Sequence, residues 1–92
     1  MMGSYKLSLE AKEDLRRIYR YGIESWDVEQ ADKYYNTLFD RFEKIARNPH
    51  LYQSVDNIRK GYRYSVCGVD TIYFRIEDGV VQIMNIIGSQ DF

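Results

Sequence analysis

The 92-residue sequence contains one cysteine, one histidine and one proline, and it lacks a long apolar run. A single cysteine, Cys67, excludes a disulfide within the chain and a cysteine-rich metal site, and a single histidine, His50, excludes a histidine-rich metal cluster. No stretch approaches the roughly 18 apolar residues of a membrane span. The first residues, which include Lys6, lack the apolar core of a secretory signal. We therefore expect a cytoplasmic protein without metal or cofactor.

The charge balance argues against a general nucleic-acid-binding protein. The net charge is −1 and the pI is about 5.8, so the basic surface typical of such proteins is missing. A small cationic patch remains possible, because Arg59, Lys60 and Arg63 are close in sequence. The nine tyrosines suit half-buried sheet faces, and they also suit contact surfaces. The length predicts a single domain, residues 1–92.

Two helices are predicted in the first half of the chain. Ser8 is a candidate N-cap, and a stripe spaced as on one helix face follows it, consisting of Ala11, Leu15, Ile18 and Gly22. Asp27 begins the second helix, whose inward stripe is the strongest periodic signal and consists of Val28, Ala31, Tyr35, Leu38, Phe42 and Ile45. Asn48-Pro49 ends this helix. The short connection predicts an antiparallel helical hairpin. At its corner, we expect Trp26 to be a packing residue rather than a binding residue.

The remaining segments predict strands. Residues 5–9 form a short β-like run, and residues 58–66, 69–76 and 80–87 are rich in β-branched and aromatic side chains. Asp78-Gly79 is a strong hairpin signal. The expected order is strand, helix, helix and then a three-stranded antiparallel meander. We predict an α+β fold in which the helical hairpin covers one face of a mostly antiparallel sheet.

Several segments resemble the ParE/RelE superfamily of bacterial toxins, the toxin halves of type II toxin–antitoxin pairs. They extend over nearly the whole chain and comprise Tyr5-Lys6-Leu7-Ser8, Ala11 with Asp14-Leu15 and Ile18, Glu24-Ser25-Trp26 with Gln30-Ala31, Ile45-Ala46-Arg47-Asn48-Pro49, Ile58-Arg59-Lys60-Gly61-Tyr62-Arg63, Ile72-Tyr73-Phe74-Arg75 and Ile86-Ile87-Gly88-Ser89-Gln90-Asp91-Phe92. The tryptophan corner and the Gln-Asp-Phe ending are most similar to the ParE branch. The resemblance implies a poison of DNA gyrase that is neutralised by a ParD-like antitoxin. The RelE branch instead cleaves messenger RNA on the ribosome.

The residues themselves argue against ribonuclease chemistry. RNA cleavage without a metal needs a proton acceptor, a proton donor and cations for the phosphate, and arginine can serve only the last role. Asp70 stands where many superfamily members carry histidine, Asn85 where many carry arginine, and Ser89 where a basic residue is common. The terminal tyrosine or histidine of the RNA-cutting branch is absent at Phe92. We expect a toxin that acts by binding and is not an enzyme. A messenger-RNA interferase, or an attenuated or inactive homologue that binds antitoxin, is the alternative.

We expect two partners, a ParD-like antitoxin and DNA gyrase, with no membrane contact and no sequence-specific DNA binding. The antitoxin segment is expected to fold in the groove between the helical hairpin and the sheet, or to add as a strand to a sheet edge. The candidate contacts are Tyr19, Tyr34, Arg59, Arg63, Tyr73 and Arg75. Each has a structural alternative, because the tyrosines could pack in the core and the arginines could pair with acids such as Asp56 or Glu77.

Overall fold

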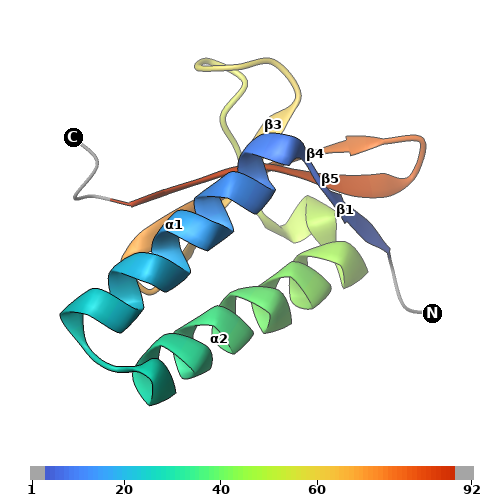
Figure 1. Ribbon diagram of the computed structural model, residues 1–92. Coiled ribbons are helices and arrows are strands. Elements are labelled where there is room, and N and C mark those ends of the chain that lie inside the picture. Colours follow the sequence, from blue (N-terminus) through green and yellow to red (C-terminus); the bar gives the residue numbers. More distant parts are fainter. Residues whose placement is uncertain (1–3, 89–92) are drawn as a thin grey trace.

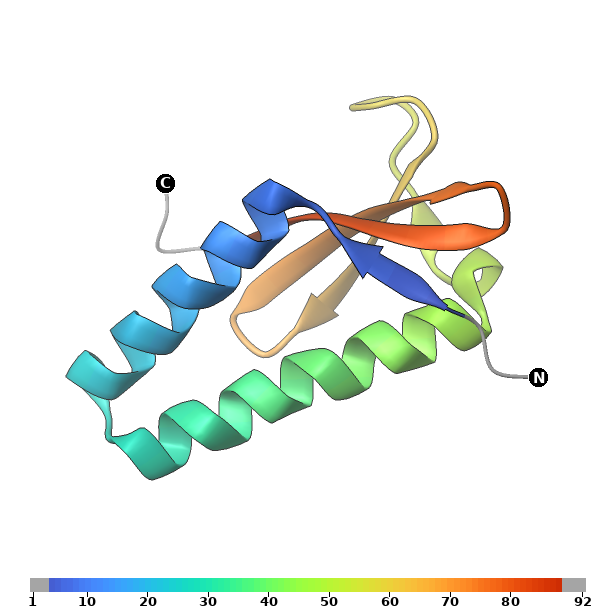
Figure 2. The ribbon, with the colours of Figure 1, turned by 45° about the vertical axis from the view of Figure 1, so that its right-hand side comes forward.

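A computed structural model describes residues 4–88 of the protein. The strands are β1 (Tyr5–Leu7), β2 (Gln53–Ser54), β3 (Tyr62–Cys67), β4 (Asp70–Glu77) and β5 (Val80–Gly88), and the helices are α1 (Leu9–Ser25), α2 (Val28–Arg47) and the short 3-10 helix η1 (Pro49–Leu51). Both long helices lie on the same face of the sheet and run antiparallel (Figures 1 and 2). The α+β prediction is confirmed. The ends of the chain, including the predicted Gln-Asp-Phe motif, lie outside the described residues.

The predicted caps begin both helices. The Ser8 Oγ atom accepts a hydrogen bond from the Ala11 backbone N–H at 3.0 Å, and Asp27 Oδ1 accepts one from the Gln30 N–H at 2.8 Å. These bonds satisfy donors that the first turn of a helix leaves unpaired. The inward stripes are largely as predicted, but Val28 is 54% exposed. As the first residue of α2 it lies at the hairpin corner, before the helix reaches the sheet.

The sheet has the order β1-β5-β4-β3-β2, with β1 parallel to β5 and the other pairs antiparallel. β5 lies inside the sheet, as its apolar sequence predicts. The predicted strand at residues 58–66 begins only at Tyr62. The preceding residues form a loop. The Val55 N–H donates a hydrogen bond to the Tyr62 carbonyl at 2.8 Å across this loop, and Gly61 within it has a φ of 83°. β2 and η1 were not predicted, because two or three residues give no periodic signal.

A bulge in β5 keeps the apolar side chains on the helical face of the sheet. Phe74 pairs with Ile83 while Tyr73 pairs with Asn85, so Met84 is the additional residue. Ile83 and Ile86 are both fully buried as a result. They pack in one core with apolar side chains of both helices and of β4, namely Leu15, Ile18, Leu38, Phe42, Ile45, Ile72 and Phe74.

Side chains of α1 cover the edge of β5 that the short strand β1 leaves open. Ser8 Oγ donates a hydrogen bond to the Met84 carbonyl at 2.8 Å. Asp14 Oδ2 accepts one from the Ile86 N–H at 2.9 Å, and Arg17 donates to the Ile86 carbonyl at 3.1 Å. These bonds fix α1 relative to the sheet. No helix among residues 4–88 has the length and apolar character needed to cross a membrane.

Candidate functional site

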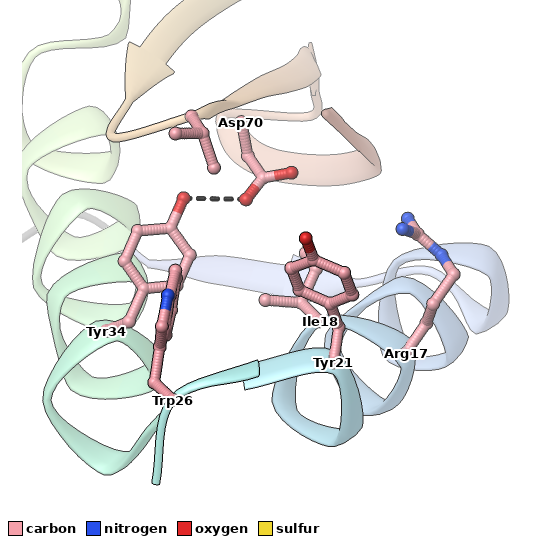
Figure 3. Close-up of a pocket in the computed structure, with 7 residues that line it drawn as sticks. Arg17, Ile18, Tyr21, Trp26, Tyr34 and Asp70 are labelled. Carbon is pink, nitrogen blue, oxygen red and sulfur yellow. Dashed lines mark hydrogen bonds between the residues drawn. The ribbon is translucent and has the colours of Figure 1, made fainter. Parts of the chain in front are cut away.

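A cavity of about 310 Å³ lies where the corner of the helical hairpin faces the β3–β4 turn. Arg17, Ile18 and Tyr21 contribute the α1 wall, Trp26 and Tyr34 contribute the wall at the corner and α2, and Val69 and Asp70 contribute the sheet side. Figure 3 shows Tyr34 and Trp26 on one side of the cavity and Arg17 on the opposite side. The cavity therefore occupies part of the predicted groove between the hairpin and the sheet.

The carboxylate of Asp70 forms the polar part of this cavity. Asp70 is 1% exposed, and the Tyr34 hydroxyl lies 2.6 Å from its Oδ2 atom and 3.0 Å from the Cys67 carbonyl (Figure 3). Burial raises the pKa of Tyr34, and the hydrogen bond to Asp70 and the charge of its carboxylate raise it further. Tyr34 therefore stays protonated and donates to the carboxylate. This contact joins α2 to the start of β4.

Gly68 allows the Tyr34 ring to approach the β3–β4 turn. Gly68 has a φ of 62°, which side chains rarely adopt. A Cβ atom on Gly68 would lie 2.5 Å from Tyr34 Cε1. Both the backbone conformation and the space thus require glycine here. The neighbouring Cys67 thiol is buried, and that burial raises its pKa, so it is a weakly reactive thiol.

The aromatic wall of the cavity is open to solvent. Trp26 is 50% exposed and Tyr21 is 49% exposed. The Trp26 ring contacts the Tyr21 and Tyr34 rings at centroid distances of 6.4 and 6.2 Å, with interplanar angles of 82° and 79°. Trp26 thus packs against two rings at the corner, and half of its surface remains accessible beside the cavity.

Four of the six candidate contacts line hollows on the surface, and Tyr19 does so beside Asp32 and Tyr35. Tyr34 lines the cavity described above. Arg59 and Tyr73 line a second hollow, on the sheet face away from the helices, together with Asn85. The Arg59 guanidinium lies 5.1 Å from the centre of the Tyr62 ring. The structure thus places the candidates on two opposite faces of the sheet, and does not bring them together in one site.

Three of the candidates, Tyr19 among them, make contacts within the fold. The Tyr19 hydroxyl donates to Asp32 Oδ1 at 2.6 Å and so connects α1 to α2. Arg63 donates to the Tyr52 carbonyl at 2.6 Å, which holds the connection after α2 against β3. Arg75 forms an ion pair with Glu77 at 2.8 Å, which was the structural alternative for this arginine.

Sequence reasoning missed most of the cavity. Tyr21 lies three residues after Ile18, so helical spacing places it beside the inward stripe of α1. This spacing was the available signal that Tyr21 lies near the cavity. Asp70 was noted only as an acid where a cation is common, and nothing in the sequence indicated its bond to Tyr34. That contact joins residues 36 positions apart in the sequence.

The histidine lies far from the buried carboxylate of Asp70. His50 is exposed in η1, which follows the C-terminal end of α2, whereas Asp70 contacts Tyr34 near the start of that helix. The part of α2 from Tyr34 to Arg47 spans roughly 20 Å. Within residues 4–88, no three histidine, cysteine, aspartate or glutamate side chains gather as possible metal ligands.

Comparison with solved structures defines the class of fold. The chain matches the structure of the chromosomal ParDE toxin–antitoxin system from P. aeruginosa with a TM-score of 0.83 and 20% identity, over 95% of this chain and 96% of that chain. It matches the toxin–antitoxin complex RelBE2 from Mycobacterium tuberculosis with a TM-score of 0.65 and 14% identity, over 96% of this chain and 99% of that one. The protein is thus an α+β domain with the fold found in ParE-type and RelE-type toxins.

Sequence comparison defines the family. The family model for the ParE toxin of the type II toxin–antitoxin system parDE matches residues 5–91. Toxin ParE1 of Caulobacter vibrioides is 39% identical over 75 residues, which cover 82% of this chain and 78% of that protein. Toxin ParE1 of Mycobacterium tuberculosis is 30% identical over 88 residues, which cover 95% of this chain and 90% of that protein. The chain belongs to the ParE family of type II toxins, and the predicted resemblance is confirmed.

Proposed function

We propose that this toxin inhibits DNA gyrase by binding it and stabilising its cleaved-DNA state. Membership of the ParE family makes it a toxin, and the mechanism is the proposed step. The observation that carries this step is the distribution of its titratable groups. The cavity at the hairpin corner does hold a carboxylate, Asp70, and a guanidinium, Arg17. Asp70 is 1% exposed and accepts a hydrogen bond from Tyr34, while Arg17 contacts Asp14 and the Ile86 carbonyl, so these engaged groups support binding over bond cleavage.

The second hollow illustrates this point. Arg59 could bind a phosphate there, since guanidinium groups bind phosphate oxygens in pairs. Its neighbours include Tyr62, Tyr73 and Asn85. A neutral asparagine cannot accept the 2′-OH proton, and a tyrosine hydroxyl serves mainly as a hydrogen-bonding group. These groups support binding over bond cleavage.

We further propose that a ParD-like antitoxin neutralises the toxin by occupying the groove between the helical hairpin and the sheet. The cavity at the hairpin corner supports this location, because it combines exposed aromatic rings with a concave surface. An antitoxin segment that is disordered alone would fold as an amphipathic helix along this groove.

The test uses purified toxin, purified gyrase and plasmid DNA. We expect loss of supercoiling activity and accumulation of cleaved DNA as the toxin concentration rises, and restoration of supercoiling when antitoxin is added. The preformed toxin–antitoxin complex at the same concentration is the control. Normal supercoiling without cleaved DNA would contradict the gyrase proposal.

The alternatives are separated in cells that express the toxin alone. New messenger-RNA ends by primer extension, without DNA breaks, would identify an interferase of the RelE type. Normal growth with folded toxin present would identify an inactive homologue. Growth arrest with DNA breaks and intact messenger RNA is the result that we expect.

A further inference from the structure

We propose that the cavity at the hairpin corner binds one cationic side chain, a lysine or an arginine, of the protein that docks in the groove. The inference rests on the proposed function and extends it, because it names the chemistry of the antitoxin residue that enters the cavity.

The aromatic wall supplies the first part of such a site. Trp26 and Tyr21 are each about half exposed at the mouth. The Trp26 ring meets both of its aromatic neighbours at nearly right angles, so the three rings do not cover one another face to face. Their faces carry negative charge density that attracts ammonium and guanidinium groups, most strongly for tryptophan. An aliphatic stem, common to lysine and arginine, would pack on the same rings.

The Asp70 carboxylate supplies the second part. It is almost fully buried on the sheet side of the cavity, and the Tyr34 hydroxyl bond fixes its Oδ2 atom. An ionised carboxylate can accept roughly four hydrogen bonds, so a charged donor can bind in addition to Tyr34. Charge attraction is also stronger in such a protein-lined site than in water.

The surrounding charges agree with a cationic guest. Arg17 also lines the cavity, but it lies opposite Tyr34 and Trp26 (Figure 3). It contacts Asp14 at 3.5 Å and donates to the Ile86 carbonyl at 3.1 Å. Arg17 is therefore engaged with other groups, and Asp70 is the acidic residue among those that line the cavity.

The size of the cavity fits the guest as well. Its volume of about 310 Å³ is about ten times the roughly 30 Å³ that one water occupies in the liquid. That space admits the side chain of arginine. A single side chain therefore fits within the cavity, and the rest of the partner lies outside.

The test uses the intrinsic fluorescence of Trp26, which is the only tryptophan in the chain and lines the cavity. The probes are N-acetyl-arginine methylamide and the citrulline analogue, which has nearly the same shape but no charge. We expect a saturable change in Trp26 emission with the arginine probe. Half-saturation with the citrulline probe should require at least a tenfold higher concentration.

Variants assign the effect to the cavity. Asp70→Asn should weaken binding of the arginine probe at least tenfold. Glu77→Gln removes a carboxylate from the distant β4–β5 hairpin and should leave binding unchanged. If Asp70→Asn loses its far-UV circular dichroism, Tyr21→Leu replaces it, because Tyr21 is exposed at the mouth and its loss should weaken binding severalfold.

The outcomes are distinct from those of the gyrase test. Equal binding of the two probes, absence of a saturable signal, or unchanged binding in folded Asp70→Asn or Tyr21→Leu would overturn the inference. None of these measurements requires gyrase or antitoxin. A toxin that inhibits gyrase but ignores the arginine probe would therefore refute the cationic site alone.

Discussion

Replacement of Tyr34 by phenylalanine tests the contact that joins α2 to the sheet. The change removes only the hydroxyl group that donates to Asp70 Oδ2 at 2.6 Å, and it keeps the ring that packs against Gly68. A hydrogen bond to a charged group contributes about 1.5–3 kcal/mol. We expect the free energy of unfolding to fall by about 2 kcal/mol, and Tm to fall by roughly 4–8 °C for each kcal/mol lost.

Urea denaturation measures this loss, with Trp26 fluorescence and far-UV circular dichroism as two independent probes. The matched control is Tyr64→Phe. Tyr64 lies half-buried on the sheet face away from the helices, and its hydroxyl makes no hydrogen bond among residues 4–88. That substitution should change stability by less than about 0.5 kcal/mol. An equally small effect for Tyr34→Phe would refute the assigned role of the hydroxyl.

The same contact predicts a pH dependence. The pKa of Tyr34 is raised above its ordinary value of 10.0, first by burial and then by the bond to Asp70. The folded state therefore keeps a proton that the unfolded state loses, so the contribution is complete below about pH 10 and declines as the pH rises further. Between about pH 9 and about pH 11, wild type should lose stability more steeply than Tyr34→Phe, by at most about 1.4 kcal/mol per pH unit. Parallel curves would contradict the raised pKa.

Three further substitutions have expected outcomes that urea denaturation checks. Gly68→Ala should lower the free energy of unfolding by at least about 1 kcal/mol more than Gly61→Ala. Both glycines have a positive φ, but only at Gly68 would the new Cβ meet a tyrosine ring. Equal losses for the two variants would contradict the close approach. Arg63→Met should cost about 1–2 kcal/mol, since the arginine binds the Tyr52 carbonyl at 2.6 Å, and unchanged stability would leave Arg63 available to a partner. Ser8→Ala should cost about 1–2 kcal/mol through its two hydrogen bonds; a loss below about 0.3 kcal/mol would show that neither bond matters.

The elements whose signals are local were predictable from the sequence. The caps at Ser8 and Asp27, the hairpin at Asp78-Gly79 and the buried stripe of α2 all depend on residues a few positions apart. The parallel pairing of β1 with β5 has no such signal, because it joins the two ends of the chain. Residues 58–61 were predicted as strand because the alternation of residues 62–66 was extended back to Ile58. The bond from Val55 and the φ of Gly61 instead make this segment a loop.

The cavity was less predictable than the fold for the same reason. Arg63 and Arg75 were predicted as contacts from their charge, but their orientation depends on the Tyr52 carbonyl and on Glu77. Trp26 was assigned to packing because a hairpin corner usually buries a large ring. Its exposure depends on how the hairpin sits over the β3–β4 turn, which periodicity along one helix does not specify.

The pairing of β1 with β5 has a consequence for synthesis of the toxin. The Ser8 hydroxyl and its partner, the Met84 carbonyl, are separated by 76 positions in the sequence. During translation, the first strand and the adjoining end of α1 emerge long before their partner exists. The helical hairpin can associate early through local contacts, but the sheet closes only when residues 80–88 leave the ribosome. A nascent chain that lacks residues 80–88 therefore presents an incomplete toxin, and the surfaces that involve the sheet form together once β5 is available.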